Sequence, residues 1–176
     1  VSYAHVTQAI SINLNDTQST IAVGLGIDTL VSVEGMIATQ GNDTLVGNSD
    51  TNLLDGQDGS DVLICQAGNV TLRGGSGNGI DTVDYSDVTG GVTVAAYGGY
   101  GSADGAFTVT GVSGTDSIDN VGANSEWGQL IEVFTLSDGN DRFIGTRFAE
   151  TVLAGAGDDT LTSGSRDVYG MRGSDL

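Results

Sequence analysis

Large apolar residues return every nine positions in two separate stretches of the chain. These positions are Leu45, Leu54, Leu63 and Leu72, and then Phe143, Val152 and Leu161. An acidic or amide residue stands two positions before most of them: Asp43, Asn52, Asp61, Asp81 (before Val83), Asp141, Glu150 and Asp159. Glycine stands two positions earlier again at Gly41, Gly59, Gly139 and Gly157. A solvated acidic surface would not explain why glycine, acidic and apolar residues share one register. This shared register predicts a repeated structural unit.

The clearest unit is Gly56-Gln57-Asp58-Gly59-Ser60-Asp61-Val62-Leu63-Ile64. Six glycine-rich residues can turn the chain tightly, because glycine accepts positive φ without steric cost. The last three residues then form a short strand whose middle side chain points inward. Stacked units would place the leucines inside and the aspartates along the edges formed by the turns. Two stacked turns can offer about six carboxylate and carbonyl oxygens, a donor set that suits calcium.

A longer repeat encloses the nonapeptides. Residues 33–47 match residues 131–145, and earlier segments also pair at smaller offsets. We therefore expect two copies of one module, residues 1–82 and 83–176, that share one continuous solenoid. The second copy stops within a unit, so we expect the chain to be a piece of a longer polypeptide. Alternating apolar residues near Ile10, Ile21, Val92 and Phe107 predict further strands that continue the solenoid without calcium.

The charge balance restricts the partners. The chain has 23 acidic and five basic residues, for a net charge of −18. So few cationic side chains cannot form a phosphate-binding stripe, which argues against nucleic acid. No apolar run approaches the roughly 20 residues that span a membrane. The single cysteine, Cys65, excludes an internal disulfide. The many acidic residues would repel one another unless they share cations, and we expect these cations to be calcium ions.

These motifs resemble the RTX family of secreted calcium-binding repeat proteins, whose nonapeptide is G-G-x-G-x-D-x-U-x. Residues 74–78 and 155–161 carry further pieces of that motif. The resemblance implies an all-β, right-handed parallel β-roll whose successive turns alternate between two edges. It implies that Asp43, Asp61 and Asp81 share one edge, opposite Asn52 and Val70. Asp141 and Asp159 would likewise share an edge, opposite Glu150.

The resemblance also assigns the candidate calcium ligands, which are turn glycines and acidic residues of these units. They are Gly41, Asp43, Gly56, Asp58, Gly59, Asp61, Gly77, Asp81, Gly139, Asp141, Gly157 and Asp159. Asp167 and Asp175 extend the series only with a broken register. One edge has Asn52 and Val70 where carboxylates would be needed, and the register breaks near the end of the chain. We therefore expect a few calcium ions and not a complete row of ions along both edges.

Other candidate sites favour structural roles over catalysis. His5 and Cys65 lack the partners that a nucleophilic site needs. Glu34 and Glu132 occupy equivalent positions of the two copies, which argues for structure and against a glycosidase pair. Trp127, with Tyr97 and Tyr100, could stack on a sugar, but aromatic packing within an insertion is the better explanation. We expect no enzyme activity in these residues.

The sequence therefore predicts calcium binding coupled to folding. The resemblance implies export in an unfolded state from a Gram-negative bacterium, followed by folding in extracellular calcium. One hypothesis is a structural or adhesive segment of a larger secreted or cell-surface protein, which could associate with itself or with surface neighbours. The alternative is the C-terminal carrier module of a type I-secreted protease, lipase or polysaccharide-modifying enzyme. In that case the catalytic domain lies elsewhere in the parent chain.

Overall fold

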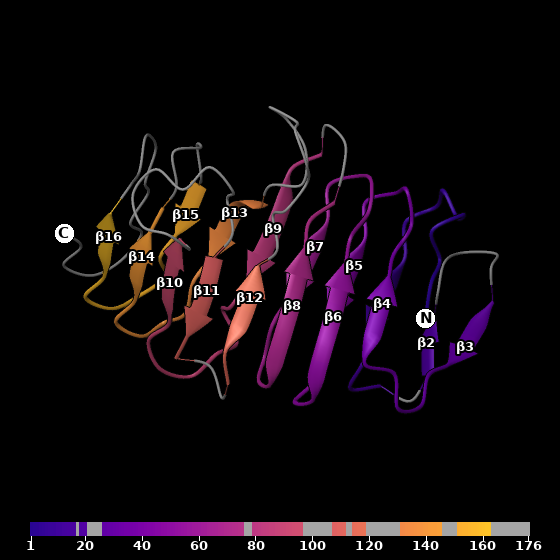
Figure 1. The fold of residues 1–176 in the computed structure, drawn as a ribbon, viewed down its shortest axis with the longest axis horizontal. Helices are drawn as coiled ribbons and strands as arrows, with labels where there is room; N and C mark the ends of the chain where they lie inside the picture. Colours follow the sequence, from indigo (N-terminus) through magenta and orange to yellow (C-terminus); the bar gives the residue numbers. More distant parts are fainter. Residues whose placement is uncertain are drawn as a thin grey trace.

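The computed structural model describes eight segments of the chain: residues 1–16, 18–20, 26–75, 79–96, 107–111, 114–118, 131–145 and 151–162. These segments contain strands and turns and no helix. Two sheets lie against each other along the length of the molecule, with short turns joining them at both edges (Figure 1). The described residues therefore form the parallel β-roll that the nonapeptide pattern predicts.

Six strands form one sheet, in the order β1-β5-β7-β9-β13-β15. Their bounds are β1 (Ser11–Asn13), β5 (Thr44–Val46), β7 (Val62–Ile64), β9 (Asp81–Asp84), β13 (Ile131–Thr135) and β15 (Thr151–Leu153). The facing sheet has eight strands, in the order β16-β14-β10-β11-β12-β8-β6-β4. Their bounds are β4 (Gly35–Ile37), β6 (Thr51–Asp55), β8 (Asn69–Arg73), β10 (Thr93–Ala96), β11 (Phe107–Thr110), β12 (Asp116–Ile118), β14 (Arg142–Ile144) and β16 (Thr160–Thr162). A separate antiparallel pair joins β2 (Gln18–Thr20) to β3 (Ile27–Thr29).

Each nonapeptide moves the chain from one sheet to the other. Leu45 pairs in register with Leu63 in the six-stranded sheet, whereas Leu54 pairs with Leu72 in the eight-stranded sheet. All four leucine side chains are fully buried. The next rung pairs Leu63 with Val83, because Gly79 and Ile80 lengthen the intervening turn. The nine-residue apolar series is therefore two facing columns that together form the interior.

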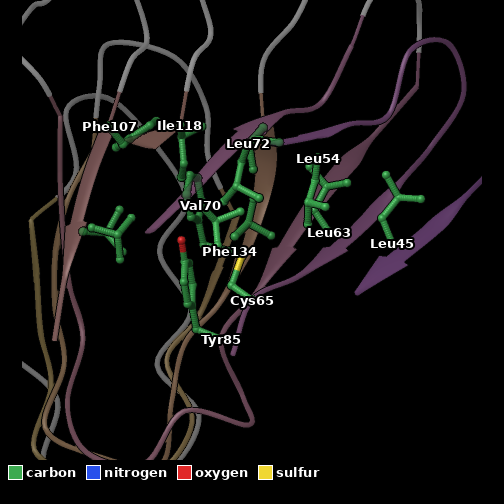
Figure 2. Packing of buried hydrophobic residues seen from close by; sticks show 14 of the residues in the cluster. Leu45, Leu54, Leu63, Cys65, Val70, Leu72, Tyr85, Phe107, Ile118 and Phe134 are labelled. Carbon is green, nitrogen blue, oxygen red and sulfur yellow. The ribbon is translucent and has the colours of Figure 1, made fainter. Parts of the chain in front are cut away.

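These buried side chains supply the main stabilisation of the roll. The labelled leucines follow one another along the interior (Figure 2). Further along, Phe134 packs edge-to-face against Phe107 and Phe143, with both pairs of ring centroids 5.0 Å apart. Removing a buried leucine or phenylalanine side chain down to alanine typically destabilises a fold by about 2–5 kcal/mol. The short strands therefore depend on the continuity of this interior.

The connecting segments differ in part from the predicted solenoid. Strand β1 does continue it, because Ile12 pairs in parallel with Leu45. Strand β11, however, runs antiparallel to both β10 and β12, so these three strands form a meander within the eight-stranded sheet (Figure 1). The sequence could not indicate this reversal, since strands with one buried face show the same alternation in either direction. The predicted strand near Ile21 lies outside the described residues.

The turns lie along two edges of the roll, which differ in the direction that the chain takes between the two sheets. The first edge consists of turns that lead from the eight-stranded to the six-stranded sheet. Their described residues are 38–43, 56–61, 74–75 and 79–80. The second edge consists of turns that lead back: residues 47–50, 65–68, 85–92, 136–141 and 154–159. None of the described residues belongs to a helix that could cross a membrane.

Candidate metal centre

A ladder of carboxylates runs along the first edge. The backbone N–H of Asp43 donates to Asp61 Oδ1 at 2.8 Å, and the N–H of Asp61 donates to Asp81 Oδ1 at 2.9 Å. The N–H of Asp81 in turn donates to Glu132 Oε2 at 2.8 Å. Each carboxylate therefore holds the neighbouring coil with one oxygen. This geometry brings Asp43, Asp61 and Asp81 to one edge, as the RTX resemblance implies, with Asn52 on the opposite sheet.

The second oxygen of Asp61 has no such partner. Asp61 is fully buried, and its Oδ2 atom makes no hydrogen bond. Burial, together with the negative charges of Asp81, Asp43 and Asp55, raises the pKa of Asp61 to about 8 against the opposing hydrogen bond from the Asp43 N–H. Burial also raises the pKa of Asp81 to about 6. A carboxylate in this position is costly unless a cation or a proton neutralises it.

Glycine 56 creates the space around this oxygen. A Cβ atom at Gly56 would collide with Asp61 Oδ2 and with the backbone carbonyl oxygen of Gly74. The two oxygens, one from a side chain and one from the next turn, therefore converge beside Gly56. A Cβ atom at Gly74 would likewise collide with Asp81 Oδ2. Convergent carboxylate and carbonyl oxygens are the donors that hard cations such as calcium prefer.

The other predicted turn residues play different parts. Gly59 and Gly157 have positive φ, and each lies against the carbonyl of the glycine one coil earlier, Gly41 and Gly139 respectively. Any side chain at Gly59 or Gly157 would therefore prevent the turns from stacking. Asp58 is an exposed residue of its turn. Gly77, the remaining predicted ligand, lies outside the described residues, as do Glu150, Asp167 and Asp175.

The second block repeats this arrangement with Asp141 and Asp159. The Val92 N–H donates to Asp141 Oδ1 at 2.6 Å, and the Asp141 N–H donates to Asp159 Oδ1 at 2.8 Å. Both aspartates are buried, and the Oδ2 atom of Asp141 makes no hydrogen bond. Burial raises the pKa of Asp141, although hydrogen bonds from Ser137 and Val92 oppose the shift. A further candidate oxygen for a cation, Asp141 Oδ2, therefore lies in this block.

The two blocks place their carboxylates on opposite edges of the roll. Asp61 precedes β7 of the six-stranded sheet, so it lies on the first edge. Asp141 and Asp159 precede β14 and β16 of the eight-stranded sheet, so they lie on the second edge. Between the blocks the chain adds the β10–β12 meander before it returns to the six-stranded sheet at β13. The aspartate-containing nonapeptides therefore lead into the six-stranded sheet in the first block and into the eight-stranded sheet in the second block.

Two acidic residues of these ladders were not among the predicted ligands. Glu132 lies at a β-bulge, where the pairing of β13 with β9 shifts between Ile131 and Val133, and this allows it to extend the first ladder. Burial raises the pKa of Glu132 to about 7. Asp116 accepts the Val70 N–H at 2.8 Å on the second edge. Each precedes a buried apolar residue by two positions, so the spacing that identified Asp61 could have identified both.

Comparison with known families identifies these turns. The RTX calcium-binding nonapeptide repeat matches the chain four times, over residues 36–65 and 136–165. These two blocks are RTX repeats. No curated protein and no solved structure matches the chain. The RTX blocks contain Asp43, Asp61, Asp141 and Asp159, whereas Asp81 and Glu132 extend the first ladder beyond them.

The residues of the RTX blocks fit calcium chemically. The described residues contain no cluster of three or more His, Cys, Asp or Glu side chains suited to a metal ion. The candidate site beside Gly56 instead combines an unpartnered carboxylate oxygen with a backbone carbonyl, and calcium accepts both types of ligand. The RTX repeat is a structural calcium-binding unit and is not itself catalytic.

The remaining candidates differ in exposure. Cys65 is buried, and burial raises the pKa of its thiol, so the reactive thiolate is disfavoured. His5 and Glu34 are exposed on separate segments. Trp127, Tyr97 and Tyr100 lie outside the described residues. In the described segments, the ladder carboxylates are therefore the best candidates for binding a ligand.

Proposed function

We propose that the roll binds calcium along both edges and that this binding drives its folding. The observation that carries the proposal is the pair of buried carboxylate oxygens that make no hydrogen bond, Asp61 Oδ2 and Asp141 Oδ2, both within the RTX blocks. Asp81 and Glu132 would extend the first series. The turn glycines act by leaving room for the backbone carbonyls to approach.

The hydrogen bonds suggest how binding is coupled to folding. Asp61 and Asp141 each use Oδ1 to accept a backbone N–H from the adjacent coil, which leaves Oδ2 for the ion. An ion held by that second oxygen therefore also favours the stacked arrangement of the coils. A bound calcium ion supplies the positive charge that offsets repulsion between the stacked carboxylates. Without it, repulsion and chain entropy oppose these short strands.

We further propose that the chain is a segment of a larger secreted or cell-surface protein, where the folded roll serves as a structural or adhesive scaffold. The RTX blocks, the net charge of −18 and the lack of an internal disulfide support export before folding. The alternative, a carrier module of a type I-secreted enzyme, requires a catalytic domain elsewhere in the parent chain. The intact mass of the native polypeptide and an activity screen would distinguish the two roles.

The calcium proposal is tested by far-ultraviolet circular dichroism of the chain during a calcium titration after chelation. We expect a cooperative gain of β-structure with calcium and none with magnesium. In Asp61→Asn the midpoint of the calcium titration should move to at least about tenfold higher calcium. Asparagine has a neutral amide in place of the carboxylate and so removes one charged oxygen ligand. Asp50→Asn is the matched control, because Asp50 is an exposed turn residue on the second edge. A β-rich spectrum that calcium does not change would overturn the proposal.

A further inference from the structure

The unpartnered buried atoms are unevenly distributed along the chain. In the described segments, buried carboxylate oxygens that make no hydrogen bond occur at Asp61 and Asp141, and none precedes Asp61. The earlier rungs nevertheless have the same nonapeptide form and belong to the same RTX block. Their polar groups must therefore be satisfied by other means.

Asp43 is satisfied by the threonine of its own turn. The Thr39 hydroxyl lies 2.9 Å from both carboxylate oxygens of Asp43, and the Thr39 N–H donates to Oδ2 at 2.7 Å. The Ile10 N–H donates to Oδ1 at 2.8 Å. Thr39 and Asp43 are both buried. Protein donors therefore occupy both oxygens of this carboxylate, including the one that remains open in Asp61.

Ser137 occupies the equivalent position in the second block but does not achieve the same result. Its hydroxyl donates to Asp141 Oδ1 at 2.7 Å and also lies 2.8 Å from the carbonyl oxygen of Gly90. The Oδ2 atom of Asp141 still lacks a partner. A hydroxyl in this position is therefore not sufficient by itself. What distinguishes the first rung is that the Thr39 hydroxyl, together with the Thr39 N–H, lies within hydrogen-bond distance of Asp43 Oδ2.

On the second edge, the first rung is closed by amides. Asn52 occupies the same position of its nonapeptide as Asp43 and Asp61 do in theirs. Its Oδ1 atom accepts the Asn48 N–H at 2.8 Å. Its Nδ2 atom donates to Asn48 Oδ1 at 3.0 Å. The amide thus presents a donor where a carboxylate would present a second acceptor. A rung closed in this way needs no cation.

A second amide contact ties this rung to its neighbours. The Nδ2 atom of Asn15 lies 3.1 Å from the Gly47 carbonyl oxygen and 3.0 Å from Gln66 Oε1. It therefore connects the segment after β1 to two successive turns of the second edge. The same region has a buried apolar interior that includes Ile12, Met36 and Leu45. Hydrogen bonds and apolar contacts here form without any charged ligand.

We propose that the described residues within 1–55 form a starter coil that folds without calcium, and that the calcium-dependent coils build on it. This inference rests on the proposed function, because it states which coils of the same roll require the ion. The starter coil comprises β1, β4, β5 and β6. It offers β7 and β8 a folded edge to pair with. Stacked repeats propagate by such neighbour contacts, so a prefolded coil removes the unfavourable first step.

Hydrogen–deuterium exchange of the whole chain in chelator and in calcium tests the proposal. In chelator, we expect amides of β5 and β6 to exchange at least about tenfold more slowly than those of β7, β14 and β16. Calcium should then slow exchange in the later strands. If β5 and β6 lose protection in chelator together with β7, the starter coil is overturned while calcium binding stands. If every strand stays protected in chelator, both the starter coil and the proposed function are overturned.

Thr39→Val provides the decisive variant, with Ser137→Ala as its matched control. Removing the Thr39 hydroxyl leaves the Asp43 carboxylate short of donors, so protection of β5 in chelator should fall at least about tenfold and return with calcium. Ser137→Ala should leave the exchange of β5 and β6 in chelator unchanged, since Ser137 lies outside the starter coil. Unchanged protection of β5 in Thr39→Val would contradict the role given to this threonine.

Discussion

Among single residues, the contrast between Asp43 and Asp61 is the most informative. Both precede a strand of the six-stranded sheet by the same interval, and both accept a backbone N–H on Oδ1. Thr39 supplies donors to Asp43, whereas Asp61 has Gln57 at the equivalent position and an open Oδ2. A buried carboxylate without donors or a cation carries the full cost of its lost hydration. One neighbouring side chain thus helps to decide how strongly a rung depends on calcium.

The raised pKa values predict how the calcium-free chain responds to pH. The pKa values of Asp61, Glu132 and Asp81 are raised in the fold, to about 8, 7 and 6 respectively. The folded state then binds protons more tightly than the unfolded state, whose carboxyl groups titrate near pH 4. Stability should therefore rise as the pH falls from about 8 to about 5. Far-ultraviolet circular dichroism of the chain in chelator, between about pH 8 and pH 5, measures this change as a gain of β-structure.

Asp61→Asn isolates the contribution of one carboxylate to this pH response. The variant cannot ionise at that position, so its β-structure in chelator should change less between about pH 8 and pH 5 than that of the parent chain. Asp50→Asn should keep the parent response, because Asp50 is exposed. A parent chain whose stability falls on acidification over this range would contradict the assignment. Saturating calcium should weaken the response, since the ion and the proton compete for the same oxygen.

Among the elements, the meander of β10, β11 and β12 most alters the roll. It gives the eight-stranded sheet two more strands than the facing sheet. Because neighbouring strands lie about 4.8 Å apart, two extra strands lengthen one face by about 10 Å. The side chains of the interior must fill the resulting space. Phe107 of the meander does so by contacting Phe134 and Phe143, which lie on opposite sheets.

Phe107→Ala should therefore destabilise the region between the two RTX blocks. The side chain is buried, and its ring lies 5.0 Å from that of Phe134 and 6.0 Å from that of Phe143. We expect a loss of about 3–5 kcal/mol in the free energy of unfolding, measured by urea denaturation in saturating calcium. Thr110→Ala, at an exposed position of the same strand, should change it by less than about 0.5 kcal/mol. Equal effects of the two substitutions would argue against the aromatic contact.

In the molecule as a whole, the sequence predicts the repeating features better than the irregular ones. The nine-residue spacing predicts the buried positions of Leu45, Leu54, Leu63 and Leu72, because each unit turns the chain by the same amount. Strand direction in the meander is not encoded in that spacing, and neither is the bulge that positions Glu132. Both depend on contacts between segments far apart in the chain. Which oxygens bind calcium stays a prediction.

The division into two modules, residues 1–82 and 83–176, also stays a prediction. The proposed boundary falls within β9, which pairs with β7 on one side and with β13 on the other. A repeat in the sequence can thus begin within a strand, since a solenoid has no gap between its coils. The interior formed by Val83 and Phe134, which pair across β9 and β13, continues through this point. We infer that the modules share one folded body.

The opposite placement of the two ladders predicts that their calcium responses are separable. Asp61 and Asp159 lie on different edges and in different RTX blocks, with the meander between those blocks in the eight-stranded sheet. Sites that share no ligands usually respond independently. Asp159→Asn should therefore abolish calcium-induced protection of β16 and preserve that of β7 in hydrogen–deuterium exchange. Loss of protection at both strands in Asp159→Asn would mean that the coils fold as one cooperative unit, because the continuous interior then couples the edges more strongly than the meander separates them.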